Sequence, residues 1–155
     1  MSGEPAPSGL VIRTLRSSDL DDVVAIDRGV MGRARSAYYG KRLAHLEREP
    51  AAFVALAAER QGRLVGFALA RLYEGEFGGA APEGALEAIG IAADERHRGV
   101  ARALTTQLAA TMRERGVRAI ASEADWTATE LLGFFASNGF AVAPEIVLER
   151  RLDMT

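Results

Sequence analysis

The sequence predicts a single-domain α/β fold, a mixed twisted sheet with helices on both faces. Its 155 residues are a typical length for one compact domain. Apolar residues make up 48% and charged residues 26%, as in folded globular proteins and unlike disordered chains. The order of predicted elements gives the fold class, because a β-hairpin is followed by alternating strands and helices. We expect a flexible tail over residues 1–9, rich in Pro, Gly and Ser, and the domain over residues 10–155.

The first third of the chain predicts one strand and two helices. Residues 10–16 alternate between apolar and polar side chains, as a strand does. Apolar residues then recur at helical spacing after Ser18, which we expect to cap this helix. A second amphipathic helix is predicted from about Ser36 to the residue before Pro50, because the residue preceding a proline disfavours the helical conformation.

The middle of the chain predicts a hairpin and a third strand. Residues 52–60 and 64–75 are two strand-like runs around the turn sequence QGR. The glycine-rich stretch 74–84 is expected to be a mobile connection that is suited to covering a substrate. A further strand is predicted over residues 85–92, with the sequence ALEAIGIA.

The last third predicts two helices and three strands. One helix ends near Gly116, and its apolar residues recur at every fourth position: Val100, Leu104, Leu108 and Met112. A strand over 117–124, a helix over 127–139 and a final pair of short strands over 140–152 follow.

Composition excludes several classes of function. The net charge of −2 gives no overall field that would attract nucleic acid or an anionic membrane, so neither is an expected partner. The chain has no cysteine and only two histidines, His45 and His97, so we expect no metal site. The amino terminus lacks the apolar run of a secretion signal, and the longest apolar run is far shorter than the roughly 20 residues that span a bilayer. We therefore expect a cytoplasmic protein.

The stretch RHRGV, residues 96–100, lies where a predicted strand turns into a predicted helix. The first amides of a helix have no partner within the helix and carry a partial positive charge, so a phosphate is stabilised there. Gly99 allows a phosphate to approach the backbone, and Arg96, Arg98 and Arg102 surround the turn with positive charge. An ordinary surface turn with solvated arginines is the alternative interpretation.

The segment RHRGVA resembles the R/Q-x-x-G-x-G/A signature of the GNAT superfamily of N-acetyltransferases. IGIAADE upstream is similar to the strand and short turn that lead into that signature, and LLGFFASNGF downstream is similar to the family's second cofactor segment. The resemblance spans residues 10–152 and implies a GNAT-like sheet, with acetyl-CoA (coenzyme A) as the acyl donor. It implies that the main chain at Ile89–Ile91 pairs with the pantetheine arm of the cofactor as an added strand does. Gly90 fits a bulge, a close approach of the cofactor or tolerated packing.

The same resemblance assigns the remaining cofactor residues. It implies that the backbone amides of one segment bind the pyrophosphate: Arg96, His97, Arg98, Gly99, Val100 and Ala101. Arg102 is a further candidate because its charge lies beside this turn. Many relatives carry a tyrosine acid four residues before the glycine of a Gly-Phe pair, but this chain has Phe135 there. We expect Phe135 to contact the cofactor without donating a proton.

Transfer of an acetyl group to an amine requires a neutral amine. An amine with a lysine-like pKa of about 10.4 is neutral in only about one molecule in 2,500 at pH 7, so a base accelerates the reaction. Glu87 is our candidate for that base, on the expectation that strand alternation places it on the same face as Ile89. A solvated strand carboxylate is the alternative for Glu87. The backbone amide of Ile91 or a neighbouring residue is the candidate donor to the carbonyl oxygen.

We therefore expect an acetyl-CoA-dependent N-acetyltransferase that acts by direct transfer to a primary amine. The acceptor classes left open are a small-molecule amine, a peptide amino terminus and a protein lysine, and the chain is expected to be a monomer or a homodimer. Arg33 and Arg35, in the turn between the first two helices, hint at an anionic acceptor. The alternative is a non-catalytic acyl-CoA-binding regulatory module, which Phe135 favours because the usual acid is missing.

Overall fold

The computed structural model describes residues 7–74 and 81–153, and its contacts divide the chain into two compact units, Met1–Glu123 and Ala124–Thr155. In the described residues, the first unit holds a five-stranded sheet and helices α1 to α3, and the second holds helix α4. Residues 1–6 of the expected tail and 75–80 of the expected glycine-rich connection lie outside the described residues. No helix in the described ranges is long and apolar enough to cross a membrane.

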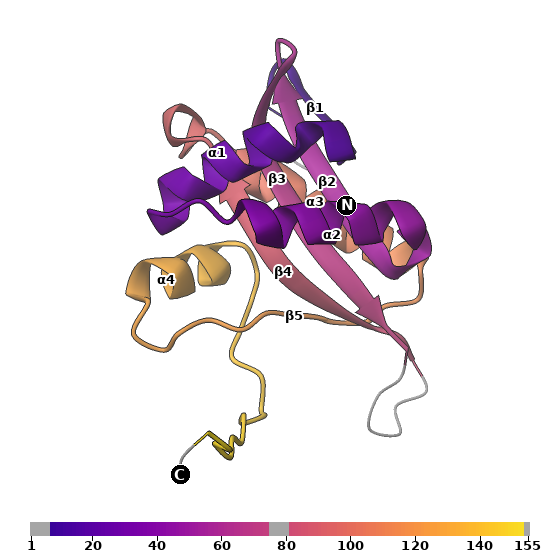
Figure 1. Ribbon diagram of the computed structural model, residues 1–155, viewed down its shortest axis with the longest axis vertical. Helices are drawn as coiled ribbons and strands as arrows, with labels where there is room; N and C mark the ends of the chain where they lie inside the picture. The colour runs from indigo at the N-terminus through magenta and orange to yellow at the C-terminus, as the bar shows by residue number, and fades with distance from the viewer. Residues whose placement is uncertain (1–6, 75–80, 154–155) are drawn as a thin grey trace. The chain divides into compact units, whose positions relative to one another are not determined.

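The helices and strands follow one another in nearly the predicted order (Figure 1). Their bounds are β1 Leu10–Thr14, α1 Leu20–Met31, α2 Ser36–Arg48, β2 Phe53–Arg60, β3 Arg63–Tyr73, β4 Glu83–Ile91, α3 Val100–Glu114, β5 Ile120–Ala121 and α4 Thr129–Ser137. Short 3₁₀ helices at Ser17–Asp19, Pro50–Ala52 and Ala93–Glu95 connect them.

The sheet is mixed, as predicted. Its strands lie in the order β1-β2-β3-β4-β5; β1 to β4 pair antiparallel, and β5 pairs parallel to β4. The β2–β3 hairpin turns at Gln61 and Gly62, whose φ angles of 52° and 76° suit the tight turn predicted from QGR. The pairing of β4 with β5 covers only Gly84 with Ile120 and Ala85 with Ala121, so the two strands share only the amino-terminal part of β4.

Helices cover both faces of the sheet in the first unit. Figure 1 shows α1 and α2 side by side on the near face and α3 behind the sheet. The near face is an apolar cluster in which Val23 of α1 and Tyr39 of α2 are buried with Phe67 of β3. On the other face, the predicted stripe of α3 is almost fully buried: Val100, Leu104, Leu108 and Met112. Burial of these two apolar surfaces supplies the main favourable term for folding of this unit.

Three local predictions are wrong. Ser18 does not cap α1 but lies in the 3₁₀ helix before it. The carboxylate of Asp19 instead accepts a hydrogen bond from the backbone amide of Arg16, 2.8 Å away. Strand β5 covers two residues instead of the predicted 117–124. Residues 140–152 form no strand with any described segment, because alternating side chains favour a strand only where a partner edge supplies hydrogen bonds.

Candidate functional site

Glu87 occupies a β-bulge in the middle of β4. Leu69 of β3 pairs with Ala88, and the next residue, Ala70, pairs with Leu86, which leaves Glu87 with no residue opposite it. A bulge shifts the alternation of side chains by one residue. The expectation that Glu87 shares a face with Ile89 is therefore wrong. The Glu87 side chain points to the α2 side of the sheet, where it meets Arg42.

The carboxyl-terminal half of β4 has an open edge. The amide of Ala92 donates to the carbonyl of Val65, 2.8 Å away, so it points toward β3. Because successive strand residues direct their amides to opposite edges, the amides of Ile89 and Ile91 point away from β3. Within the described residues, β5 pairs only with Gly84 and Ala85, so it does not cover that edge. Two backbone amides are thus available to a ligand that lies along the strand.

Ser122 marks the point where β4 and β5 separate. Its hydroxyl donates to the carbonyl of Leu86, 3.0 Å away, immediately before the bulge. The bulge and this hydrogen bond lie next to each other, and beyond them the main chain of β4 is exposed on one edge. The sequence contains no periodic signal for this contact, so Ser122 was not among the predicted site residues.

Helix α3 begins at the predicted phosphate turn. Gly99 precedes the helix with φ 81°, in the left-handed region, and His97 also has a positive φ of 61°. The amide of Ala103 donates to the carbonyl of Gly99 at 3.0 Å and so joins the helix to the turn. The amides of Val100 and Ala101 precede that bond, so they lie at the end of the helix where an anion is stabilised.

A buried carboxylate holds the base of this turn. Glu95, 6% exposed, accepts hydrogen bonds from Arg60 at 3.2 Å and from Arg98 at 3.3 Å. Arg98 is thus held back by Glu95 and is less available to a ligand than the sequence suggested. Arg96 and His97 are exposed on the turn.

A glycine of β3 brings the two cofactor segments together. A Cβ at Gly66 would lie 3.0 Å from a methyl group of Val100 and 3.1 Å from Cδ1 of Ile91. The start of α3 and the end of β4 therefore meet over Gly66, a residue that the sequence analysis missed. Gly90 has a packing role, because a Cβ there would lie 2.7 Å from the Phe67 ring and 3.0 Å from Ile26. The bulge considered at Gly90 lies instead at Glu87.

Arg42 and Tyr38 of α2 lie beside Glu87. The Nε atom of Arg42 is 3.3 Å from Oε2 of Glu87, although that oxygen is buried and accepts no properly aligned hydrogen bond from the described residues. The Arg42 guanidinium also lies over the Tyr38 ring, 5.4 Å from its centre. Burial disfavours the charged form of Arg42, but the Tyr38 hydroxyl and the Glu87 carboxylate outweigh it and raise the Arg42 pKa. Sequence spacing gives no signal for the pairing of a helix residue with a strand residue so far along the chain.

A second ion pair lies between α1 and α2. Arg35 donates to both oxygens of the buried Asp27 carboxylate, at 2.8 and 2.6 Å. The Tyr39 hydroxyl also donates to Asp27, at 2.7 Å. Burial and the bond to Asp27 raise the pKa of Tyr39, so this tyrosine is a poor source of the missing acid. Arg35 is neutralised in the protein and does not favour an anionic acceptor as the sequence suggested.

Phe135 lies on α4, in the second unit. Within that unit its ring contacts those of Phe134 and Phe140, with ring centres 5.7 and 4.9 Å apart. These edge-to-face contacts make Phe135 part of a small aromatic cluster.

A shallow cavity of about 400 Å³ lies elsewhere in the first unit. It is lined by residues of β1, β2, the end of α2 and the second half of α3, among them Arg13 and Phe53, and by Arg115 directly after α3. None of the predicted site residues lines it. The β4 edge and the start of α3 are the candidate functional site, because unpaired main-chain donors and a buried carboxylate gather there.

Comparison with known proteins assigns the family. A model of the acetyltransferase (GNAT) family matches residues 20–140. The chain belongs to the GNAT acetyltransferase family. The matched range of this GNAT protein contains the Glu87 bulge, the open edge of β4 and the turn at Gly99. No curated protein gives a significant match to the sequence.

Solved structures confirm the GNAT fold. The crystal structure of aminoglycoside 6'-N-acetyltransferase AAC(6')-Ih from Acinetobacter baumannii has a TM-score of 0.78 at 18% identity, and the match covers 93% of this chain and 99% of that one. AAC(6')-Iy in complex with CoA has a TM-score of 0.78 at 20% identity, over 96% and 98% of the two chains. Ribosomal-protein-alanine N-acetyltransferase from Brucella melitensis biovar Abortus 2308 has a TM-score of 0.72 at 22% identity, over 92% and 99%. At these identities the likeness establishes the fold.

Proposed function

We propose that this GNAT protein is an acetyl-CoA-dependent N-acetyltransferase that moves an acetyl group to a primary amine by direct transfer. The observation that carries the proposal is the open edge of β4 directly after Glu87, whose Oε2 atom is buried. An extended cofactor arm that pairs with this edge has its reactive end near the bulge that carries Glu87. Family membership supports this chemistry, since the family is one of acetyltransferases.

The cofactor fits the residues of the first unit. The amides of Ile89 and Ile91 would hold the pantetheine arm, and the start of α3 at Val100 and Ala101 would hold the pyrophosphate. Gly99 leaves the backbone accessible at that point. When bound, acetyl-CoA supplies an activated thioester whose carbonyl carbon the amine can attack.

Glu87 acts as the general base in this proposal. Its buried Oε2 takes a proton from the incoming ammonium, which leaves the nitrogen lone pair free to form the C–N bond. The Ile89 amide is the proposed donor to the carbonyl oxygen, because it points to the open edge and lies closer than the Ile91 amide to the bulge at Glu87. The C–S bond breaks, its electron pair leaves on the sulfur, and the second proton of the nitrogen passes to that thiolate.

The alternative is a non-catalytic acyl-CoA-binding module. Two observations favour it: Phe135 stands where many relatives carry a tyrosine acid, and Glu87 is already paired with Arg42. A thiol has an ordinary pKa of about 8.5, so its thiolate is a tolerable leaving group at neutral pH without a dedicated acid. We therefore favour the enzyme over the binding module.

A thiol-release assay distinguishes the two functions. The full-length protein is mixed with acetyl-CoA and a panel of primary amines that includes amino acids, peptides with free amino termini and an aminoglycoside, and free coenzyme A thiol is followed over time. We expect amine-dependent thiol release with at least one class. Saturable binding of acetyl-CoA without thiol release on any amine would show that the protein is a binding module.

A further inference from the structure

The Arg42–Glu87 pair has an unusual geometry. Only 27% of the Arg42 side chain and 12% of the Glu87 side chain are exposed, yet the Nε to Oε2 contact at 3.3 Å is not an aligned hydrogen bond. No other carboxylate of the described residues pairs with Arg42. The guanidinium therefore has donors at its Nη atoms that no protein carboxylate occupies. Its place over the Tyr38 ring keeps it on the Glu87 side of α2.

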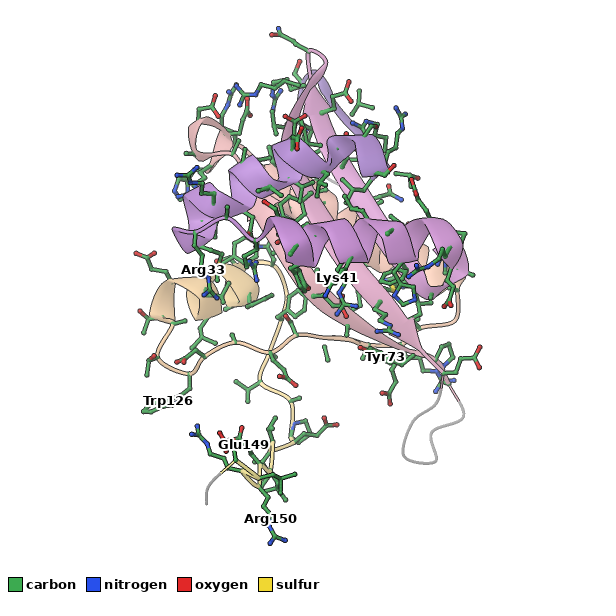
Figure 2. All side chains as sticks on the ribbon, in the orientation of Figure 1. Arg33, Lys41, Tyr73, Trp126, Glu149 and Arg150 are labelled. Carbon is green, nitrogen blue, oxygen red and sulfur yellow. The ribbon has the colours of Figure 1, made fainter. Side chains whose placement is uncertain are left out.

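The charge balance of this pair restricts what can bind. Arg42 and Glu87 neutralise each other, so a simple ammonium that pairs with Glu87 would leave a net positive charge in a partly buried place. Further positive charge lies on the same segment, because Arg33 precedes α2 and Lys41 lies on it (Figure 2), and neither forms an ion pair within the described residues. Arg35 adds none, since Asp27 neutralises it. A polycationic acceptor is repelled by this arrangement.

A ligand that carries both charges restores the balance. Its ammonium group pairs with Glu87 while its carboxylate pairs with Arg42, so each protein charge exchanges one partner for another of the same sign. Guanidinium is suited to this exchange, because its planar set of donors matches the two oxygens of a carboxylate. In an α-amino acid one carbon separates the amine from the carboxyl carbon, a spacing that suits two protein groups already in contact.

Building on the proposed function, we propose that the acceptor is a small amine with an adjacent carboxylate, an amino acid, and that Arg42 is the residue that binds this carboxylate. Glu87 takes one proton from the ammonium, the amine nitrogen forms a bond with the acetyl carbon, and the thioester C–S bond breaks to release thiolate. The second proton of the nitrogen passes to that thiolate, which leaves a neutral amide and a thiol. Arg42 exchanges no proton in this reaction. It selects and orients the acceptor.

The test compares each amino acid with its own carboxamide. The full-length protein is assayed for acetyl-CoA-dependent thiol release with the twenty amino acids and their amides, and kcat/KM is measured for each pair. We expect kcat/KM for each amino acid to exceed kcat/KM for its carboxamide by about tenfold to a hundredfold, because a charge-assisted hydrogen bond corresponds to a factor of that size. The α-amine of the carboxamide loses its proton more easily than the α-amine of the amino acid, so a larger fraction of the carboxamide is neutral at a given pH. A preference for the amino acid therefore cannot come from a larger fraction of neutral amine.

Substitutions at Arg42 then assign the preference to this residue. Arg42→Gln should abolish the difference between acid and amide, mainly through KM, and Arg42→Lys should keep part of it because the charge remains. Arg48→Gln, at the exposed end of the same helix, is the control and should keep the full difference. Thermal unfolding and coenzyme A binding of each variant show whether it is folded.

The outcomes separate this proposal from the proposed function. Equal kcat/KM for acids and amides, or a preference that survives Arg42→Gln, would overturn the role of Arg42 and leave the acetyltransferase proposal standing. Thiol release with none of the amines would overturn both. Preferential acetylation of the aminoglycoside or of peptides over amino acids would also refute an amino-acid acceptor.

Discussion

The Arg42 guanidinium of α2 lies 3.3 Å from the Glu87 carboxylate at the bulge of β4. The bulge turns Glu87 toward this helix and away from the face that carries Ile91, so one carboxylate lies between the open strand edge and a cation of α2. The acceptor amine and the residues that would recognise it are therefore expected on the α2 side of the sheet, and the cofactor arm along its edge.

Replacement of Glu87 by glutamine should slow turnover most near neutral pH. The amide cannot accept the proton of the ammonium, so kcat/KM should fall and should partly recover as the pH approaches the pKa of the acceptor amine. Initial rates from pH 6.5 to 9.5, with coenzyme A affinity as a fold check, measure the effect. Glu83→Gln, an exposed position on the same strand, is the control. A pH profile identical to that of the wild type would mean that Glu87 is not the base.

Gly99→Glu should abolish binding of coenzyme A. A side chain at this position meets backbone strain at φ 81° and lies close to Pro7, and its carboxylate would repel a phosphate at the start of α3. Gly116→Glu is the matched control, since φ there is 83° and the strain is similar, about 1–3 kcal/mol. Both variants should lose thermal stability, but only Gly99→Glu should lose the cofactor in calorimetry. Normal cofactor binding by Gly99→Glu would refute the phosphate turn.

Gly90→Ala should destabilise the fold by about 1–3 kcal/mol through overpacking. The added methyl group would lie 2.7 Å from the fully buried Phe67 ring, which cannot move aside without disturbing the core. Gly29→Ala in α1 is the control: its Cβ meets nothing within 4 Å, and alanine in a helix should stabilise by about 0.5–1 kcal/mol. Urea unfolding measures both. Equal free energies of unfolding for the two variants would show that the core around Gly90 rearranges to make room for the added methyl group.

Asp27 should make the protein sensitive to acid. Burial raises the pKa of Asp27, but hydrogen bonds from Arg35 and Tyr39 outweigh it and hold that pKa below its ordinary value. A carboxyl with a depressed folded pKa contributes stability above the unfolded pKa, about 4, and loses it as the pH falls through the folded value. Asp27→Asn should lower the free energy of unfolding at pH 7 by about 1–3 kcal/mol. Below about pH 4 that free energy should fall less steeply in the variant than in the wild type. Melting temperatures from pH 7 to 3 measure the loss of stability with falling pH. If Asp27→Asn lost stability below about pH 4 as steeply as the wild type, Asp27 would not be the acid-sensitive group.

Phe135 should contribute little to the chemistry as it stands. Its ring cannot donate a proton, so Phe135→Leu should retain measurable turnover, and Phe135→Tyr should raise turnover less than about tenfold, about 1.4 kcal/mol of barrier. Initial rates at saturating acetyl-CoA measure both. A wild-type protein that is silent on every amine and gains activity only through Phe135→Tyr would identify a binding module.

Local patterns in the sequence predicted most of the fold. The stripe from Val100 to Met112 predicted the buried face of α3, and QGR predicted the hairpin turn, because both depend on residues close together in the chain. The strands expected over 140–152 did not form, because a strand depends on a partner edge that its own residues do not specify.

The candidate site was predictable only in part. Glu87 and Gly99 were chosen through residue type and motif; Glu87 lies at the bulge of β4, and Gly99 lies directly before α3. The bulge reversed the face expected for Glu87. A bulge depends on how two strands pair, so the alternation of apolar and polar residues along one strand does not reveal it. Arg42 was missed for a similar reason: its partner lies 45 residues away, and only the packing of α2 on the sheet brings them together.

Calorimetric titration of the full-length wild-type protein with acetyl-CoA shows whether the open edge of β4 and the start of α3 form a site for this cofactor. We expect saturable binding of one cofactor per chain with a Kd in the micromolar range, which corresponds to about −8 kcal/mol. The absence of any binding heat or thermal shift at millimolar acetyl-CoA would show that the edge of β4 and the start of α3 do not bind this cofactor.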